Sequence, residues 1–239
     1  MRIDILSLFP EFFSILSNLS IIGRAREENK VQINNINIRD FSKNKHKKVD
    51  DYPFGGGPGM VMTPEPILGA INSVKDTNSR VVYLSPQGKP FNQELANELS
   101  KETHLILLCG HYEGIDNRII DNYIDEEISV GDFVLTGGEI PAMIIVDAVV
   151  RLLPGVLSGD ESFMEESHYN GLLEHPQYTR PREFNGYSIP DVLLSGNHKN
   201  IEYWKKEESL RATLNKRPDL LEKKIFSKEE MDILSKIKE

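Results

Sequence analysis

The sequence is poor in cysteine, with a single one, Cys109, among its 239 residues. One cysteine excludes an intrachain disulfide framework and any zinc site built from several cysteines. No apolar run approaches the ~18 residues of a membrane-spanning helix. The first residues, MRIDILSLFPEFF, lack the pattern of a signal peptide, because Asp4 and Pro10 interrupt them. We therefore expect a cytoplasmic protein with no membrane segment.

The common nucleotide-binding and catalytic motifs are also missing. The sequence contains no G-x-x-x-x-G-K-[ST], G-x-G-x-x-G, H-E-x-x-H or G-x-S-x-G. Its six histidines are scattered, without the paired spacing of a tight zinc site. A nucleotide-like ligand would have to bind without a P-loop or a Rossmann glycine motif, and we expect no metal site built by the protein.

Basic residues are outnumbered by acidic ones, 28 to 37, and the resulting net charge of −9 taken alone disfavours binding to nucleic acid. The distribution is uneven, however. Between Arg24 and Lys48 eight Lys and Arg stand against three Asp and Glu, most densely in RDFSKNKHKK. Charge alone favours an RNA-binding face and an ordinary solvated surface equally.

Hydrophobic residues are plentiful, at 39%, which is enough for a sizeable core. Short apolar runs such as RVVYLSPQG and HLILLCGHYEG alternate with segments of helical period such as PEFFSILSNLSIIGRAREEN and IPAMIIVDAVVRLL. Strands that are apolar on both faces and alternate with helices predict an α/β fold with a parallel sheet.

The character of the sequence changes beyond Leu153. A stretch rich in Gly, Pro, Ser and acid predicts a long linker or ordered loop. From Asp191 onward the helical pattern returns and predicts a small, all-helical C-terminal domain. In its last segment, SKEEMDILSKIKE, Ser227 and Glu230 have the spacing of a capping box.

Three glycine-bearing segments, SPQG, GHYEG and SVGDFVLTGGE, each follow a predicted strand. Ligands of parallel sheets bind at the carboxyl ends of the strands, so the three loops predict one small-molecule site. Glu113, between two glycines, is suited to reach a ribose hydroxyl, but a helix-capping turn gives the same pattern. The segment DDYPFGGGPGMVM has four glycines and two prolines and predicts no regular structure. Its FGGGPGM loop, residues 54–60, fits either a structural turn or a ligand lying against bare backbone.

Acidic residues gather in the expected linker, and most clusters of this kind are solvated surface. The cluster comprises Asp160, Glu161, Glu165 and Glu166. Arg151, at the end of the apolar helix, precedes Glu166 by 15 residues. An acid and an arginine beside a ligand cleft suit removal of a proton and stabilisation of the resulting anion.

Aromatic residues near the C-terminus allow two interpretations. In HPQYTRPR, Tyr178, Arg180 and Arg182 combine an aromatic ring with positive charge, as in contacts to RNA. Tyr203 and Trp204 lie in a helical pattern and are more typical of helix packing than of base stacking.

Six segments together resemble the signature blocks of the bacterial tRNA (guanine-N1)-methyltransferases, which belong to the SPOUT class. They are YLSPQG, LLCGHYEGIDNR, ISVGDFVLTGGEIPAM, RLLPGVL, GLLEHPQYTRP and LLSGNH. The resemblance implies a deep trefoil knot in the parallel-sheet domain, S-adenosylmethionine as methyl donor, and a homodimer whose subunits share each active site. The implied substrate is a tRNA, methylated at N1 of the guanosine immediately 3′ of the anticodon when another guanosine precedes it, which maintains the reading frame.

The same resemblance assigns residues to roles. Carried over onto this sequence, the cofactor pocket comprises Tyr83, Leu84, Ser85, Gly110, Glu113, Gly114, Ser129, Val130, Gly131, Asp132, Phe133, Val134, Leu135, Gly137, Gly138 and Pro141. The family's catalytic base, an acid before Ser-Phe in the linker, matches Glu166 by its spacing from Arg151 and Gly171. Glu161, in a local Glu-Ser-Phe triplet, is the alternative. Arg151 is assigned to stabilising charge on guanine O6, and the resemblance leaves room for a magnesium ion in that role.

The implied domains are a knotted methyltransferase domain (1–158), a flexible acidic linker (159–170) and a helical tRNA-binding domain (171–239). Two other functions stay open. One is a SPOUT methyltransferase acting on ribosomal RNA or a ribose 2′-hydroxyl, against which HPQYTRP and the linker acid argue. The other is a nucleotide- or RNA-binding module without catalysis, which would lack Arg151 or the linker acid, whereas this sequence has both.

Overall fold

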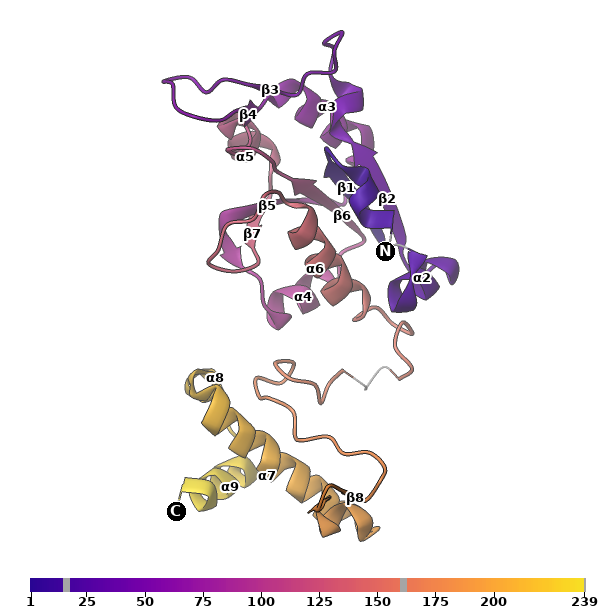
Figure 1. The fold of residues 1–239 in the computed structure, drawn as a ribbon, viewed down its shortest axis with the longest axis vertical. Coiled ribbons are helices and arrows are strands. Elements are labelled where there is room, and N and C mark those ends of the chain that lie inside the picture. The colour runs from indigo at the N-terminus through magenta and orange to yellow at the C-terminus, as the bar shows by residue number, and fades with distance from the viewer. Residues whose placement is uncertain (15–17, 160–162, 239) are drawn as a thin grey trace. The chain divides into compact units, whose positions relative to one another are not determined.

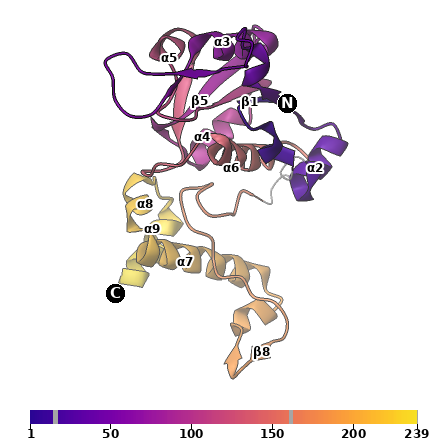
Figure 2. The same cartoon turned by 45° about the horizontal axis from the view of Figure 1, so that its top comes forward.

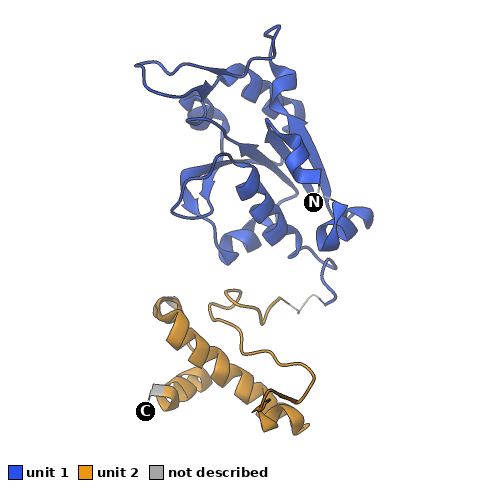
Figure 3. Cartoon of the chain, in the orientation of Figure 1, with its two compact units in different colours: residues 1–160 blue, residues 161–239 orange. Residues whose placement is uncertain are grey.

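The computed structural model describes residues 1–14, 18–159 and 163–238. The chain divides into two compact units, Met1–Asp160 (unit 1) and Glu161–Glu239 (unit 2), coloured separately in Figure 3. The predicted linker, residues 159–170, spans this division, and its role stays a prediction. Glu161, the alternative base, lies outside the described residues.

Unit 1 is built on a five-stranded sheet in which all neighbouring strands are parallel, in the order β2-β1-β6-β5-β7 (Figure 1). Its strands are β1 (Arg2–Ser7), β2 (Gln32–Asn37), β5 (Ser79–Pro90), β6 (His104–Cys109) and β7 (Glu126–Ser129). The predicted α/β fold with a parallel sheet is therefore confirmed.

Helices cover both faces of this sheet. They are α2 (Ser20–Glu27), α3 (Pro64–Val74), α4 (Gln93–Leu99), α5 (Asn117–Tyr123) and α6 (Glu139–Val150). Successive residues of a strand point to opposite faces, and on β6 Leu105 and Leu107 join the core beneath α4 and α6, whereas Ile106 and Leu108 join the core beneath α3 and α5. Figure 2 shows the two helix pairs on opposite sides of the strands. Burial on both faces explains why the strands read as continuous apolar runs.

Three local predictions were wrong. The single helix expected from Pro10 is interrupted, because Leu19 is extended and α2 begins only at Ser20; before it lies a 3-10 turn, η1 (Pro10–Phe13). β5 does not stop at SPQG but continues to Pro90, with a register shift against β7 after Leu84. The glycine-rich segment expected to be wholly irregular is closed by two short antiparallel strands, β3 (Asp50–Asp51) and β4 (Val61–Met62).

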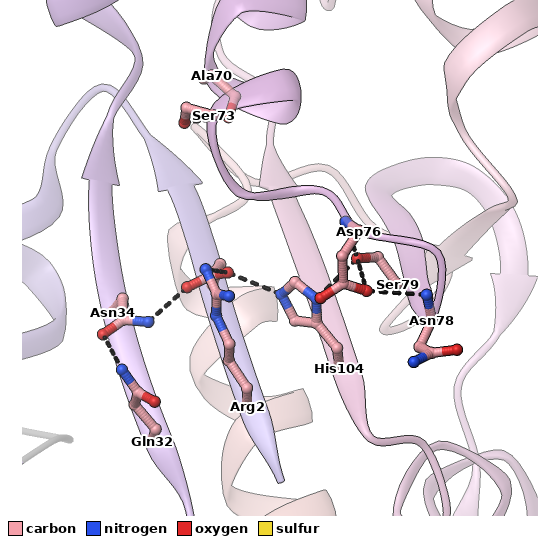
Figure 4. A network of polar contacts seen from close by, with 10 residues as sticks. Arg2, Gln32, Asn34, Ala70, Ser73, Asp76, Asn78, Ser79 and His104 are labelled. Atoms are coloured by element: carbon pink, nitrogen blue, oxygen red, sulfur yellow. Dashed lines mark hydrogen bonds and ion pairs between the residues drawn. The ribbon is translucent and has the colours of Figure 1, made fainter.

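A buried polar network joins the strands at their amino ends (Figure 4). The fully buried Asp4 carboxylate forms an ion pair with Arg2 at 2.7 Å and accepts a hydrogen bond from Asn34 Nδ2 at 2.6 Å. Its Oδ2 also lies 2.7 Å from His104 Nε2, and His104 Nδ1 lies 2.7 Å from Ser79 Oγ. The network links β1, β2, β5 and β6 at the edge opposite their carboxyl ends.

Unit 2 contains the remaining helices, η3 (Asp191–Leu194), α7 (His198–Lys216), α8 (Pro218–Lys223) and α9 (Lys228–Lys238). Leu172, Leu210 and Ile233 form its small core. The capping box before α9 is confirmed, since Ser227 N–H donates to Glu230 Oε2 at 2.7 Å and Glu230 N–H to Ser227 Oγ at 3.2 Å.

Unit 2 also contains a hairpin within the stretch that the sequence indicated was a linker or loop. Its strands are β8 (Glu183–Phe184) and β9 (Tyr187–Ser188). Asn185-Gly186 between them is a strong short-range hairpin signal, and it was available in the sequence.

Candidate functional site

Three glycine-bearing segments, SPQG within β5 and the loops that follow β6 and β7, line one cavity, as the sequence predicted. All sixteen residues assigned to the cofactor pocket line it except Asp132. The sequence did not single out the other lining residues, which are Pro86, Gln87, His111, Tyr112, Ile128 and Thr136. Most of these adjoin predicted positions in the same loops, so loop continuity was the signal that could have found them. Cofactor binding by this set stays a prediction.

Two of the loops cross at bare backbone. Gly138 N–H donates to Gly110 O at 2.9 Å, and His111 forms a β-bridge with Gly137. A Cβ at Gly138 would lie 2.7 Å from Cys109 Cα, and one at Gly110 would lie 2.8 Å from Tyr83 Oη. The backbone atoms beside Gly138 cannot move aside as a flexible side chain can, so the glycines allow the loops to come this close.

The FGGGPGM loop reaches the same cavity through Glu113. Glu113 N–H donates to Met60 O at 3.0 Å, and a Cβ at Gly59 would lie 2.4 Å from Glu113 Oε1. Gly59 has a φ of +80°, which a residue with a side chain rarely adopts. Phe54, at the start of the loop, is fully exposed. One end of the loop therefore contacts Glu113, which lines the cavity, and the other end projects into solvent.

Burial keeps two titratable side chains at this end of the sheet, Tyr83 and Cys109, protonated. Burial, assisted by the Glu127 carboxylate, raises the pKa of Tyr83 to about 12, against an opposing hydrogen bond from Ile115. Burial and the nearby Glu139 carboxylate raise the pKa of the Cys109 thiol well above its ordinary value. Tyr83 thus keeps its hydroxyl proton as a cavity wall, and Cys109 is no thiolate nucleophile.

The two residues assigned to the chemistry lie in different units. Arg151 follows α6 directly, is half-buried, and its N–H donates to Asp147 O at 3.3 Å. Glu166 is half-buried in a turn whose Tyr169 N–H donates to Glu166 O at 3.3 Å. The pairing of Arg151 with Glu166 stays a prediction.

Neither a metal cluster nor a membrane helix is found in the described part of the chain. Among residues 1–14, 18–159 and 163–238, no three His, Cys, Asp or Glu side chains are grouped so that they could hold a metal ion. The described donor set thus offers no place for magnesium, and we derive no step from it. No helix of these residues is both long and apolar enough to cross a bilayer.

The basic segment Arg39–Lys48 is partly neutralised. Lys47 pairs with Asp40 at 2.6 Å, Lys43 with Glu65 at 2.6 Å and Lys48 with Asp51 at 3.2 Å, all with exposed side chains. Exposed pairs of this kind contribute about 0–1 kcal/mol. The lysines can therefore exchange these carboxylates for phosphates at low cost.

In unit 2 the structure brings together aromatic residues that the sequence separated. The ring centroids of Trp204 and Tyr178 are 6.4 Å apart, and those of Trp204 and His175 are 5.9 Å apart. Trp204 is half-buried and Tyr178 is 49% exposed. These ring contacts join Trp204 to the candidate RNA-contact segment HPQYTRPR, and its role in helix packing stays a prediction.

A parallel sheet with a glycine-lined cavity at its carboxyl edge is the arrangement in which α/β proteins bind small molecules. The protein-family model described as "tRNA (Guanine-1)-methyltransferase TrmD" matches residues 1–223 of the chain. The chain therefore belongs to the tRNA (guanine-1)-methyltransferase family, and it is a methyltransferase. The resemblance inferred from the six sequence blocks is confirmed.

Individual relatives are similar along nearly their whole length. A protein of Ruminiclostridium cellulolyticum is 60% identical over 226 residues, covering 93% of this chain and 97% of the relative. One of Alkaliphilus oremlandii is 58% identical over 246 residues, covering 100% and 99%. One of Dictyoglomus turgidum is 55% identical over 238 residues, covering 100% and 97%. All three are named tRNA (guanine-N(1)-)-methyltransferase.

Proposed function

We propose that this chain transfers a methyl group from S-adenosylmethionine to N1 of the guanosine immediately 3′ of the anticodon, in tRNAs where another guanosine precedes it. The observation that carries the proposal is the cavity lined by the three glycine-bearing segments, within β5 and after β6 and β7, in a member of this family. Methylation of that position would serve to maintain the reading frame in the cytoplasm.

The cavity residues fit such a methyl donor. At Gly110 and Gly138 the missing side chains let the loops pack closely around the cavity. Leu84 and Val134 offer apolar walls, and the Glu113 carboxylate is an acceptor for ribose hydroxyls. S-adenosylmethionine, when bound, supplies an electrophilic methyl group.

The remaining chemistry needs a base and a cation. Guanine N1 carries a proton at neutral pH, so its lone pair is not free to attack. In this proposal the Glu166 carboxylate accepts that proton, and the Arg151 guanidinium stabilises negative charge that moves to guanine O6. Glu161 is the alternative base.

Two substitutions test the base. A positioned general base contributes about 10²–10⁴-fold to the rate, so Glu166→Gln should lower single-turnover methyl transfer by that factor with unchanged affinity for S-adenosylmethionine. Glu165→Gln, at an exposed neighbour that pairs with Lys205 at 3.7 Å, is the matched control. Full activity of Glu166→Gln with loss in Glu161→Gln would transfer the role to Glu161.

A pair of transcripts tests the position of the methyl group. One tRNA transcript carries two guanosines at the 3′ edge of the anticodon, and in the other the second guanosine is replaced by adenosine. The proposal predicts label from S-adenosylmethionine only in the first, mapped to N1. Label confined to ribosomal RNA or to a ribose 2′-hydroxyl would favour the alternative methyltransferase function.

We infer that tRNA contacts the basic segment Arg39–Lys48 and the helical unit 2. The segment's exposed lysines support this, because their surface ion pairs are cheap to exchange. Raising the salt concentration should weaken tRNA binding steeply and leave cofactor binding nearly unchanged. Equal salt dependence of the two affinities would contradict this assignment.

We further propose that unit 1 is threaded as a trefoil knot. The proposal is supported by the loop crossing at Gly110 and Gly138, and by Gly88, where a Cβ would lie 2.5 Å from the Ile128 backbone nitrogen. Such close passages allow one segment to thread beneath another without side chains in the way. Crystallographic tracing of residues 79–140 checks the threading.

A homodimer with shared active sites belongs to the same proposal. On α6, Ile140 is 46% and Ile144 43% exposed, and their spacing of four places both on one helix face. Ile140 and Phe12 line a small apolar cavity with Gly137, which also lines the cofactor cavity. A second copy of the chain covering this strip would lie beside the site.

The oligomeric state of a charged variant tests the dimer. Ile144→Glu should convert dimer to monomer in sedimentation and abolish transfer, because a carboxylate would be buried without a partner. Ile225→Glu, at an isoleucine in unit 2 that is 95% exposed, is the control and should change neither. A dimeric, active Ile144→Glu would refute this interface.

A further inference from the structure

Two aromatic side chains project from the tip of the β8–β9 hairpin. Phe184 is 67% exposed and Tyr187 82% exposed, and the two residues are directly paired across the hairpin. Residues opposite each other in an antiparallel pair have side chains on the same face. The hairpin therefore presents two adjacent rings to solvent, whereas aromatic rings normally contribute to a protein core or an interface.

The turn and the strand pairing fix the backbone that carries these rings. Its two turn residues, Asn185 and Gly186, have φ angles of 51° and 82°, as a two-residue hairpin turn of type I′ requires. Ile189 N–H donates to Arg182 O at 3.1 Å and extends the pairing beyond the strands. A backbone fixed in this way loses little conformational entropy when a partner covers the rings.

Positive charge and a further aromatic residue lie just before the hairpin in the chain. Arg180 is exposed, and Arg182 is largely exposed in an ion pair of 3.0 Å with Asp191. Tyr178, against Trp204, is half exposed. Rings interleaved with arginines suit unpaired nucleotides, whose bases stack on the rings while their phosphates pair with the guanidinium groups.

We propose that Phe184 and Tyr187 form a stacking platform for unpaired bases of a tRNA loop, with Arg180 contacting a nearby phosphate. The choice of tRNA as the occupant rests on the proposed function. The platform touches the substrate away from the reacting atoms, so its contribution is to bind and position the RNA. A protein partner, including a second copy of this chain, would leave the adjacent arginines without phosphates to pair with.

A double variant, Phe184→Ala with Tyr187→Ala, tests the platform in the full-length protein. Loss of one stacked base is worth about 1–3 kcal/mol, so the affinity for a tRNA transcript should fall by about 5- to 150-fold. The slope of affinity against salt should stay the same, because no phosphate contact is lost. Arg180→Gln should instead reduce that slope by about one. Ile225→Ala, at another exposed apolar residue of unit 2, is the control.

A ring-preserving variant, Phe184→Tyr with Tyr187→Phe, guards against a simple folding defect. It should bind tRNA like the wild type, while the alanine variant raises KM for tRNA with little change in kcat. A 2-aminopurine in the anticodon loop should lose fluorescence on binding to the wild type but not to the alanine variant.

Three outcomes would overturn the platform: unchanged tRNA affinity in the alanine variant, a salt slope that falls with the affinity, or a shift in oligomeric state. Failure of the proposed function gives a different result. The wild type would then bind tRNA, with affinity dependent on the two rings, and place no methyl group on guanine N1.

Discussion

At the amino ends of the strands, charged side chains hold the sheet together, whereas at the carboxyl ends bare backbone does so. Asp4 and His104 are buried and hydrogen-bonded to neighbours on four strands. At the other edge Gly138 and Gly110 meet directly through their backbones, and the space between the loops is a cavity. The buried network engages nearly all its polar groups within the protein, Arg2 Nε excepted, whereas the carboxyl edge opens onto a cavity. Stability and the proposed cofactor binding are therefore separated along the strands.

The largest effect should follow from breaking the amino-end network. Asp4→Ala removes the carboxylate that Arg2, Asn34 and His104 share, and breaking a buried pair costs about 3–5 kcal/mol. Urea denaturation should record this loss in the free energy of unfolding, while the folded protein still binds S-adenosylmethionine normally. Asp40→Ala, in an exposed pair with Lys47, is the control and should cost less than about 1 kcal/mol. If Asp4→Ala instead lowered cofactor affinity without lowering stability, the amino-end network would support binding and not stability.

Alkaline pH should weaken the carboxyl end through Tyr83. Its pKa is raised from the ordinary 10.0 to about 12 in the folded protein, so the folded state retains a proton that the unfolded state releases. The resulting stability is fully present below about pH 10 and is lost as pH rises to about 12. Two pKa units correspond to about 2.7 kcal/mol, an order-of-magnitude figure. Tyr83→Phe should flatten this limb of the stability–pH profile, and Tyr52→Phe, at a tyrosine 78% exposed, should leave it intact.

A methyl group at the loop crossing should affect binding as well as stability. In Gly138→Ala the new Cβ meets Cys109 and Gly110 backbone, and overpacking of this kind costs about 1–3 kcal/mol. If the loops shift to relieve the contact, the affinity for S-adenosylmethionine should fall roughly 10- to 100-fold by calorimetry. Gly159→Ala, where an added Cβ meets open space, should bind normally. Normal cofactor affinity in Gly138→Ala would show that the crossing does not shape the pocket.

The smallest effect is expected at acid pH and at the amino end. The Asn78 N–H, with Ser79 and His104 as lesser contributors, lowers the pKa of Asp76 below its ordinary value. Its contribution to stability is therefore present above about pH 4 and is lost as pH falls through the lowered pKa. Asp76→Asn should make the acid limb of thermal unfolding slightly shallower. An unchanged acid limb would show that Asp76 does not contribute to the dependence of stability on pH.

The sequence predicted what depends on local pattern. Runs such as HLILLC indicated a parallel sheet because both faces of β6 are buried. Glycines after the strands indicated the edge of the sheet at which a ligand is expected to bind. The SKEE capping box was readable for the same reason, since Ser227 and Glu230 contact each other within one turn.

Features that depend on distant contacts were not predictable in this way. Asp4 looks like an ordinary polar residue until β6 brings His104 beside it, 100 positions along the chain. The continuation of β5 to Pro90 depends on pairing with β7. The β8–β9 hairpin was different, because Asn185-Gly186 carried the signal and the surrounding Gly, Pro and Ser obscured it.

A crystal structure of the chain with S-adenosylmethionine would show directly whether the cofactor binds at the carboxyl edge of the sheet. We expect the cofactor between the three glycine-bearing segments, against residues 83–85, 110–114 and 129–135, with the amino-end network unchanged. A cofactor bound elsewhere, or a cavity that stays empty at saturating concentration, would contradict the assignment of binding to the carboxyl edge.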